Sequence, residues 1–191
     1  NSSCTPTFRR IGHRHFLVLS ANHAPTTSPT TPPIGPTAKN ASIARLPSGA
    51  WLAVGAFGRA LTSSDEGKTW NKAEITDAGD KHLNRIVSAK DGSRWLIFGE
   101  RGFVLTSTDG AKTWSVVPPF YNGSLYGAVQ LDDGSWVAYG MRGNAYRAGP
   151  DAQSWTKSTV PAPISMFGHA KAADGSLLGS LLFGVGLHGC R

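Results

Sequence analysis

Cysteine is nearly absent from this sequence of 191 residues, in which only Cys4 and Cys190 occur. Two cysteines near opposite ends exclude a disulfide-rich scaffold. Two unrelated free thiols are favoured over a Cys4 to Cys190 bridge, which would need an oxidising compartment. Long apolar runs are also missing, and no stretch reaches the roughly 18 residues that a membrane-spanning helix needs. The sequence therefore predicts a chain without a membrane span.

Charged residues are few, at 16% of the chain against 40% hydrophobic residues, which favours a globular protein. The net charge of +7 is unevenly spread, because residues 1–40 contain Arg9, Arg10, Arg14 and Lys39 but no acidic residue. The remainder carries only +3. This mild basic excess argues against a nucleic-acid partner.

Residues 1–40 show no sustained hydrophobic period and contain six of the twelve prolines, a composition typical of a linker or a disordered segment. The arginine pair 9–10 and the apolar stretch 16–21 have the order of a secretory signal. The sequence His-Arg-His at 13–15 interrupts that short apolar core, so the signal is a poor one. Its two histidines lack a third ligand, and we assign no metal and no cofactor.

An eight-residue motif is the strongest signal in the sequence. Residues 63–70 read Ser-Ser-Asp-Glu-Gly-Lys-Thr-Trp, and residues 107–114 repeat them as Ser-Thr-Asp-Gly-Ala-Lys-Thr-Trp after 44 residues. A third, degenerate copy at 149–155 follows 41 residues later. This period is typical of one four-stranded propeller blade. In such a tight turn the Asp carboxylate accepts backbone N–H groups, Gly adopts a backbone conformation that other residues resist, and Trp packs beneath the turn.

Each repeat divides into four short strands at Gly or Asp-Gly turns. The expected strands are 42–46, 50–55, 59–63 and 69–74, then 84–89, 94–99, 103–107 and 113–117, then 126–131, 135–140, 144–148 and 155–159. A fourth repeat begins at 168–172, turns at Asp174 and Gly175, and then loses the pattern. The second strand of each repeat is apolar on both faces, as expected for a blade between two neighbours.

We therefore predict an all-β fold with two regions: a linker-like segment 1–40 and a partial β-propeller 41–191. Its blades lie at about 41–75, 84–119, 126–160 and 168–191. About three and a half blades are present. Because blades bury both faces only between neighbours, we expect an incomplete propeller that can self-associate through open blade edges.

The motif resembles the Asp box of the bacterial-neuraminidase-repeat propellers. The segments 52–63 and 96–107, with their two glycines three residues apart, resemble the photosystem II stability and assembly factor-like propellers. This resemblance covers residues 41 to about 178. It implies a ring of more blades than the sequence supplies, and a structural role for the recurring motif residues Ser63, Asp65, Gly67, Trp70, Ser107, Asp109, Trp114 and Trp155.

The turns between the second and third strands lie at 56–58, 100–102 and 141–143, on the rim opposite the Asp-box turns. The connections between blades, 76–83, 118–125 and 161–167, join this same rim. Arginines beside aromatic side chains are common in protein contacts, although solvated turn arginines are the plain alternative. The candidate binding residues on this rim are His82, Arg101, Phe120, Tyr121, Asn122 and Arg142.

A glycoside hydrolase fragment, of the sialidase or xyloglucanase kind, is the alternative function. Such an enzyme needs two carboxylates about 5 to 10 Å apart. The rim turns offer only Glu100, and the first repeat has Phe57 where a third arginine would stand. We therefore predict no catalytic residues and no enzyme activity.

The sequence favours a non-enzymatic propeller scaffold that binds a protein or peptide and assists the assembly or stability of a complex. A periplasmic or secreted location fits this function, and a cytoplasmic location stays open as the alternative.

Overall fold

The computed structural model describes residues 42–160, 163–171, 177–181 and 187–188. These residues form three four-stranded antiparallel sheets and one three-stranded sheet. The all-β fold and its partial set of blades are thus as predicted. The linker-like segment 1–40, the signal-like stretch, both cysteines and the turn at Asp174 and Gly175 lie outside the described residues. Within the described part, no helix is long and apolar enough to cross a membrane.

The strands follow the repeat boundaries. Blade 1 contains β1 (Ser42–Arg45), β2 (Trp51–Val54), β3 (Ala60–Ser63) and β4 (Asn71–Ala73). Blade 2 contains β5 (Leu83–Ser88), β6 (Trp95–Gly99), β7 (Val104–Ser107) and β8 (Ser115–Val116). Blade 3 contains β9 (Leu125–Gln130), β10 (Trp136–Gly140), β11 (Ala145–Ala148) and β12 (Trp155–Ser158). Blade 4 contains β13 (Met166–Lys171), β14 (Leu177–Leu181) and β15 (Leu187–His188), so its first strand begins two residues before the predicted start. Two short 3-10 turns, η1 (Ala56–Gly58) and η2 (Met141–Gly143), link the second and third strands of blades 1 and 3.

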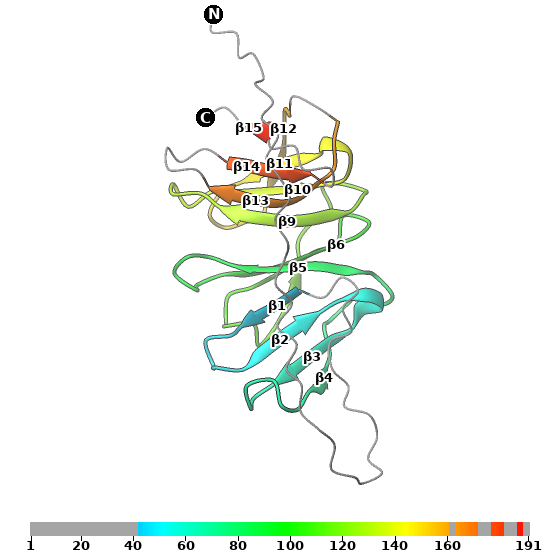
Figure 1. Ribbon diagram of the computed structural model, residues 1–191, viewed down its shortest axis with the longest axis vertical. Helices are drawn as coiled ribbons and strands as arrows, with labels where there is room; N and C mark the ends of the chain where they lie inside the picture. The colour runs from blue at the N-terminus through cyan, green and yellow to red at the C-terminus, as the bar shows by residue number, and fades with distance from the viewer. Residues whose placement is uncertain (1–41, 161–162, 172–176, 182–186, 189–191) are drawn as a thin grey trace, which may run out of the picture.

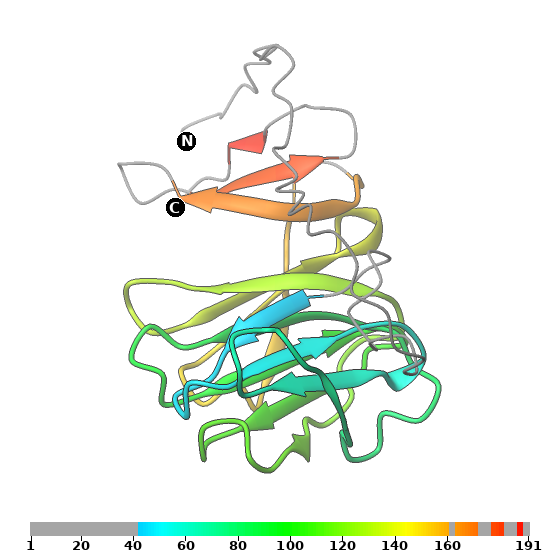
Figure 2. The same ribbon diagram turned by 60° about the horizontal axis from the view of Figure 1, so that its bottom comes forward.

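The blades stand side by side as an arc, with blades 1 and 4 at opposite ends (Figure 1). The first strands, β1, β5, β9 and β13, lie next to one another in the order of the blades, as the rotated view also shows (Figure 2). Side-chain hydrogen bonds connect the edges of these first strands. The Ile86 amide donates to Ser42 Oγ at 3.2 Å, and Asn84 Nδ2 donates to the Leu125 carbonyl at 2.9 Å. Neighbouring side chains therefore satisfy one edge amide of β5 and one edge carbonyl of β9.

The core lies between the blades. One apolar cluster joins blades 1 and 2, a second joins blades 2 and 3, and a smaller one joins blades 3 and 4. Leu96, Ile97 and Phe98 of β6 are fully buried, because neighbouring blades cover both faces of this strand. This confirms that the doubly apolar second strand marks a sandwiched blade.

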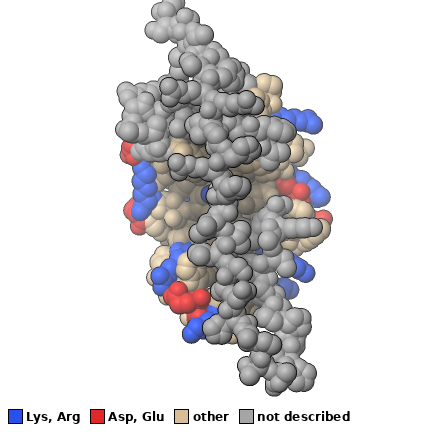
Figure 3. All heavy atoms as spheres, viewed as in Figure 1, with Lys and Arg blue, Asp and Glu red and all other residues tan. Residues whose placement is uncertain are grey.

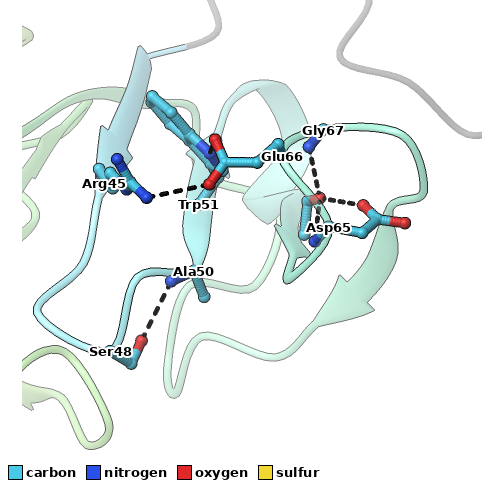
Figure 4. Close-up of polar contacts among 8 residues, drawn as sticks. Arg45, Ser48, Ala50, Trp51, Asp65, Glu66 and Gly67 are labelled. Atoms are coloured by element: carbon cyan, nitrogen blue, oxygen red, sulfur yellow. Dashed lines mark hydrogen bonds and ion pairs between the residues drawn. The ribbon is translucent and has the colours of Figure 1, made fainter.

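The two full copies of the turn motif share one hydrogen-bond pattern. Thr69 donates to the Asp65 carboxylate from its amide at 2.9 Å and from its hydroxyl at 2.6 Å, and Ser63 Oγ donates at 2.8 Å. Thr113 and Ser107 repeat these bonds to Asp109. Figure 4 shows the first turn, where Glu66 also accepts from Arg45 and Trp51. The carboxylate thus closes the β3–β4 and β7–β8 hairpins.

These bonds predict acid sensitivity. Hydrogen bonds from the Thr69 hydroxyl, the Thr69 amide and Ser63 lower the pKa of Asp65 from 3.8 to about 2. The equivalent bonds from Thr113 and Ser107 hold the pKa of Asp109 well below its usual range. A folded-state pKa below the unfolded one means that both groups stabilise the fold above pH about 4, and that this stability is lost as pH falls towards about 2.

Urea unfolding at several pH values measures this effect. The parent's midpoint should drop between pH about 4 and about 2. The Asp65→Asn, Asp109→Asn double variant should start lower at neutral pH and drop less over that interval. If the urea midpoints of the parent and the double variant fell by the same amount with pH, other carboxylates would be the cause of the acid sensitivity.

Candidate functional site

Three turns at corresponding places in blades 1 to 3 carry a non-glycine residue in the left-handed backbone region. These are Phe57, Arg101 and Arg142, with φ of 56°, 54° and 55°. The next residue is a glycine with positive φ in every case, at 58, 102 and 143. Left-handed backbone costs an L-residue about 1 kcal/mol. The same strained tip is therefore built three times, with a large side chain at each.

Hydrogen bonds tie each turn to the neighbouring blade connection. The Gly58 amide donates to the Lys81 carbonyl at 2.7 Å, and the Gly102 amide donates to the Gly123 carbonyl at 2.8 Å. A Cβ at Gly102 would lie 1.7 Å from the Tyr121 carbonyl oxygen, so only glycine allows this approach. The turns and the connections thus share one rim, which we call the tip rim.

The first two tips have partners within the protein. The exposed Phe57 ring lies edge-on to His82, with 4.9 Å between the ring centroids. The Arg101 guanidinium lies 3.9 Å from Asp80. Between them, Glu100 accepts the His82 amide at 3.1 Å, so this carboxylate holds the turn to the connection. His82 and Arg101 are therefore both on the tip rim.

Arg142 differs from Arg101. Its amide donates to Ser165 Oγ at 2.9 Å, but its guanidinium takes part in none of the ion pairs among the described residues. Tyr121 lies near enough for its pKa to respond to Arg142, although burial is the main cause and raises that pKa. An exposed arginine that has no ion-pair partner in the described part of the chain can receive an anionic group.

The remaining candidate residues divide into buried and exposed ones. Phe120 stacks on Trp155 at 5.2 Å and lies edge-on to Tyr146 at 5.0 Å. Tyr121 also packs on Tyr146, at 5.2 Å. Both rings lie against the core between blades 2 and 3 and are partly buried. Asn122, by contrast, is exposed beside them.

Charge is interspersed elsewhere on the molecule. In the part of the face that Figure 3 shows uncovered, basic and acidic side chains lie next to one another along both margins. Within the described residues, no group of three or more His, Cys, Asp or Glu side chains could hold a metal ion. Neither the pairing of Asp80 with Arg101 nor the left-handed tips were predicted from the sequence. The glycine that ends each turn, at 58, 102 and 143, was the feature of the sequence that could have indicated left-handed backbone there.

No protein-family model matches the sequence, and no curated protein matches it. Several solved structures are similar to this chain. The chain is 24% identical to YCF48 bound to D1 peptide, with a TM-score of 0.57 over 76% of this chain and 48% of that one. It is 18% identical to YCF48 from Cyanidioschyzon merolae, with a TM-score of 0.57 over 77% and 52%. The extracellular domain of a putative hybrid two-component system from B. thetaiotaomicron gives 12% identity and a TM-score of 0.62 over 78% and 21%. The chain thus spans about half the length of the two YCF48 structures, and it has the β-propeller fold.

Proposed function

We propose that this chain is a non-enzymatic propeller scaffold that binds a protein or peptide through its tip rim. The observation that carries this proposal is the threefold repetition of a left-handed tip with a large, exposed side chain. The opposite rim also has left-handed residues, at Glu66, Ala111 and Ala152, but of these only Glu66 is exposed. Strained non-glycine residues persist where the surrounding structure fixes them, and they cluster at functional sites. Two of the three tips are arginines, a residue type enriched in interfaces.

The chemistry of the rim favours an acidic partner segment. Arg101 and Arg142 stand at equivalent places in adjacent blades. The structural neighbour YCF48 has been solved with a bound D1 peptide, which supports peptide recognition as a use of this fold. By the same comparison we propose a role in assembling or stabilising a complex. A periplasmic or secreted location, and self-association through the outer faces of blades 1 and 4, belong to the same proposal.

A hydrolase function has less support. The Glu100 carboxylate accepts the His82 amide, so it already has a structural role, and Asp80 lies beside Arg101. A general acid and its partner carboxylate would each have to face a bound sugar. We therefore propose no catalytic residue on this rim.

A charge-matched pair of variants tests the proposal. The Arg101→Ala, Arg142→Ala double variant should bind a fluorescein-labelled peptide of alternating glutamate and alanine about tenfold more weakly than the parent, measured by fluorescence anisotropy. The Lys68→Ala, Lys112→Ala variant removes the same charge from the opposite rim and should bind like the parent. Added salt should weaken parent binding, because exposed charges are screened. Equal losses in the two variants would attribute binding to net charge and contradict the proposal.

A further inference from the structure

Blades 2 and 3 differ at two corresponding positions around their arginine tips. The tip itself is Arg101 in blade 2 and Arg142 in blade 3. Two residues later, Phe103 corresponds to Asn144. On the outermost strand, Val116 pairs with Leu105 of β7, and Lys157 pairs with Tyr146 of β11 at the matching register position. Because the backbone framework is repeated, these exchanges show what blade 3 has that blade 2 lacks.

In blade 2, an apolar aromatic ring follows the arginine tip. Phe103 is only 8% exposed, and the Lys81 ammonium lies over its ring at 4.8 Å. Arg101 lies near Asp80, and Val116 is apolar. The Phe103 ring packs in the cluster between blades 1 and 2, and the nearby carboxylate offsets part of the charge of the arginine. Blade 2 therefore has an apolar ring and a carboxylate where blade 3 has polar and basic groups.

Blade 3 is open at the same place. An open depression of about 470 Å³ lies beside its tip. Its lining consists of Arg142, Gly143, Asn144, Lys157, Ser158, Thr159, Val160 and Pro163. Among the described residues, this lining contains two cations and no carboxylate. Like Arg142, Lys157 takes part in none of the ion pairs among the described residues. Asn144 is held in place, because its Nδ2 donates to the Met141 carbonyl at 2.9 Å.

The connection before blade 3 lacks the carboxylate that Arg101 has as its partner in blade 2. Gly58 bonds to the carbonyl of Lys81, and Gly102 bonds to the carbonyl of Gly123, so Lys81 and Gly123 occupy corresponding places. The residue before Lys81 is Asp80, the partner of Arg101. The residue before Gly123 is Asn122, which has no charge. An amide thus stands where the carboxylate stands one blade earlier, and it leaves the Arg142 charge available.

We propose that the depression on blade 3 is a carboxylate site, in which Arg142 and Lys157 together receive an acidic side chain of the bound peptide. The site rests on the proposed function and makes it more specific: the two arginine tips are unequal, and blade 3 holds the anion. Arg142 and Lys157, which take part in no ion pair among the described residues, line the same depression as the Asn144 amide and the hydroxyl groups of Ser158 and Thr159. Cations and hydrogen-bond donors of this kind suit a planar oxyanion. Asn122 makes blade 3, and not blade 2, the anion site, because an uncharged amide stands where Asp80 stands beside Arg101.

The experiment measures binding of the labelled glutamate–alanine peptide to single variants. Arg142→Gln and Lys157→Gln should each weaken binding about fivefold or more, whereas Arg101→Gln should change it less than twofold. Asn122→Asp should weaken binding as much as Arg142→Gln, because it recreates the Asp80 to Arg101 pair one blade later. Lys72→Gln is the matched control for Lys157→Gln, since Lys72 occupies the corresponding place on β4 and should have no effect. A glutamine–alanine peptide should not bind.

Thermal unfolding followed by circular dichroism confirms that each variant is folded before binding is compared. If Lys157→Gln matches Lys72→Gln, or if Asn122→Asp binds like the parent, the carboxylate site is wrong. In that case a loss in the Arg101→Ala, Arg142→Ala variant would still support the tip rim. If the parent itself does not bind the acidic peptide, both proposals fail together.

Discussion

Replacing Gly102 by alanine should destabilise the protein by at least about 3 kcal/mol. Its φ of +68° already costs an L-residue about 1 to 2 kcal/mol. A Cβ there would also lie 1.7 Å from the Tyr121 carbonyl oxygen, so the turn would have to leave the connection and break the bond from the Gly102 amide to Gly123. Urea unfolding of Gly102→Ala measures the loss.

Gly92→Ala is the matched control in the same blade. Gly92 has nearly the same φ, +71°, but no heavy atom lies within 4 Å of the position that its Cβ would take. This variant should lose only the backbone cost, about 1 to 2 kcal/mol. Equal losses in the two variants would show that the tip and the connection do not approach as closely as described.

Trp136→Ala should have the second large effect, a loss of about 3 to 5 kcal/mol in unfolding free energy. Trp136 is the largest fully buried side chain, and it lies in the cluster between blades 2 and 3. Its removal leaves a cavity that two packed sheets cannot fill without moving. Calorimetric or urea unfolding measures this change.

Trp51 occupies the corresponding place in blade 1, at one end of the arc, and is only partly buried. It donates to Glu66 at 3.3 Å, and Arg45 lies 5.8 Å from its ring centroid. Trp51→Ala should therefore cost clearly less than Trp136→Ala. The reverse order would contradict the arrangement of blades, in which blade 3 lies between two neighbours.

The fold was largely predictable from the repeat. Residues 63–70 and 107–114 fixed the period, and the glycines fixed the turns, so the strand boundaries agree within a few residues with the observed ones. Local turn chemistry determines these features, and local chemistry is readable in one sequence. The rim was also predictable, because alternate turns of a sheet lie at opposite ends of it.

The details of the site depended on contacts between blades. The packing of Phe120 on Trp155 joins residues 35 positions apart in the sequence, so the exposure of this ring could not be predicted from its neighbours along the chain. The near approach of Asp80 to Arg101 and the hollow beside Arg142 also arise from how one connection lies over the next blade. The correspondence of Asp80 to Asn122 became visible only through the backbone bonds of Gly58 and Gly102.

Hydrogen–deuterium exchange with and without the acidic peptide tests most directly the claim that the tip rim is the binding face. The peptide should slow exchange in the turns 100–102 and 141–144, with the largest change at 141–144, and should leave the turns 64–70 and 108–113 on the opposite rim unchanged. Slowed exchange at 64–70 and 108–113, with none at 100–102 and 141–144, would contradict the account.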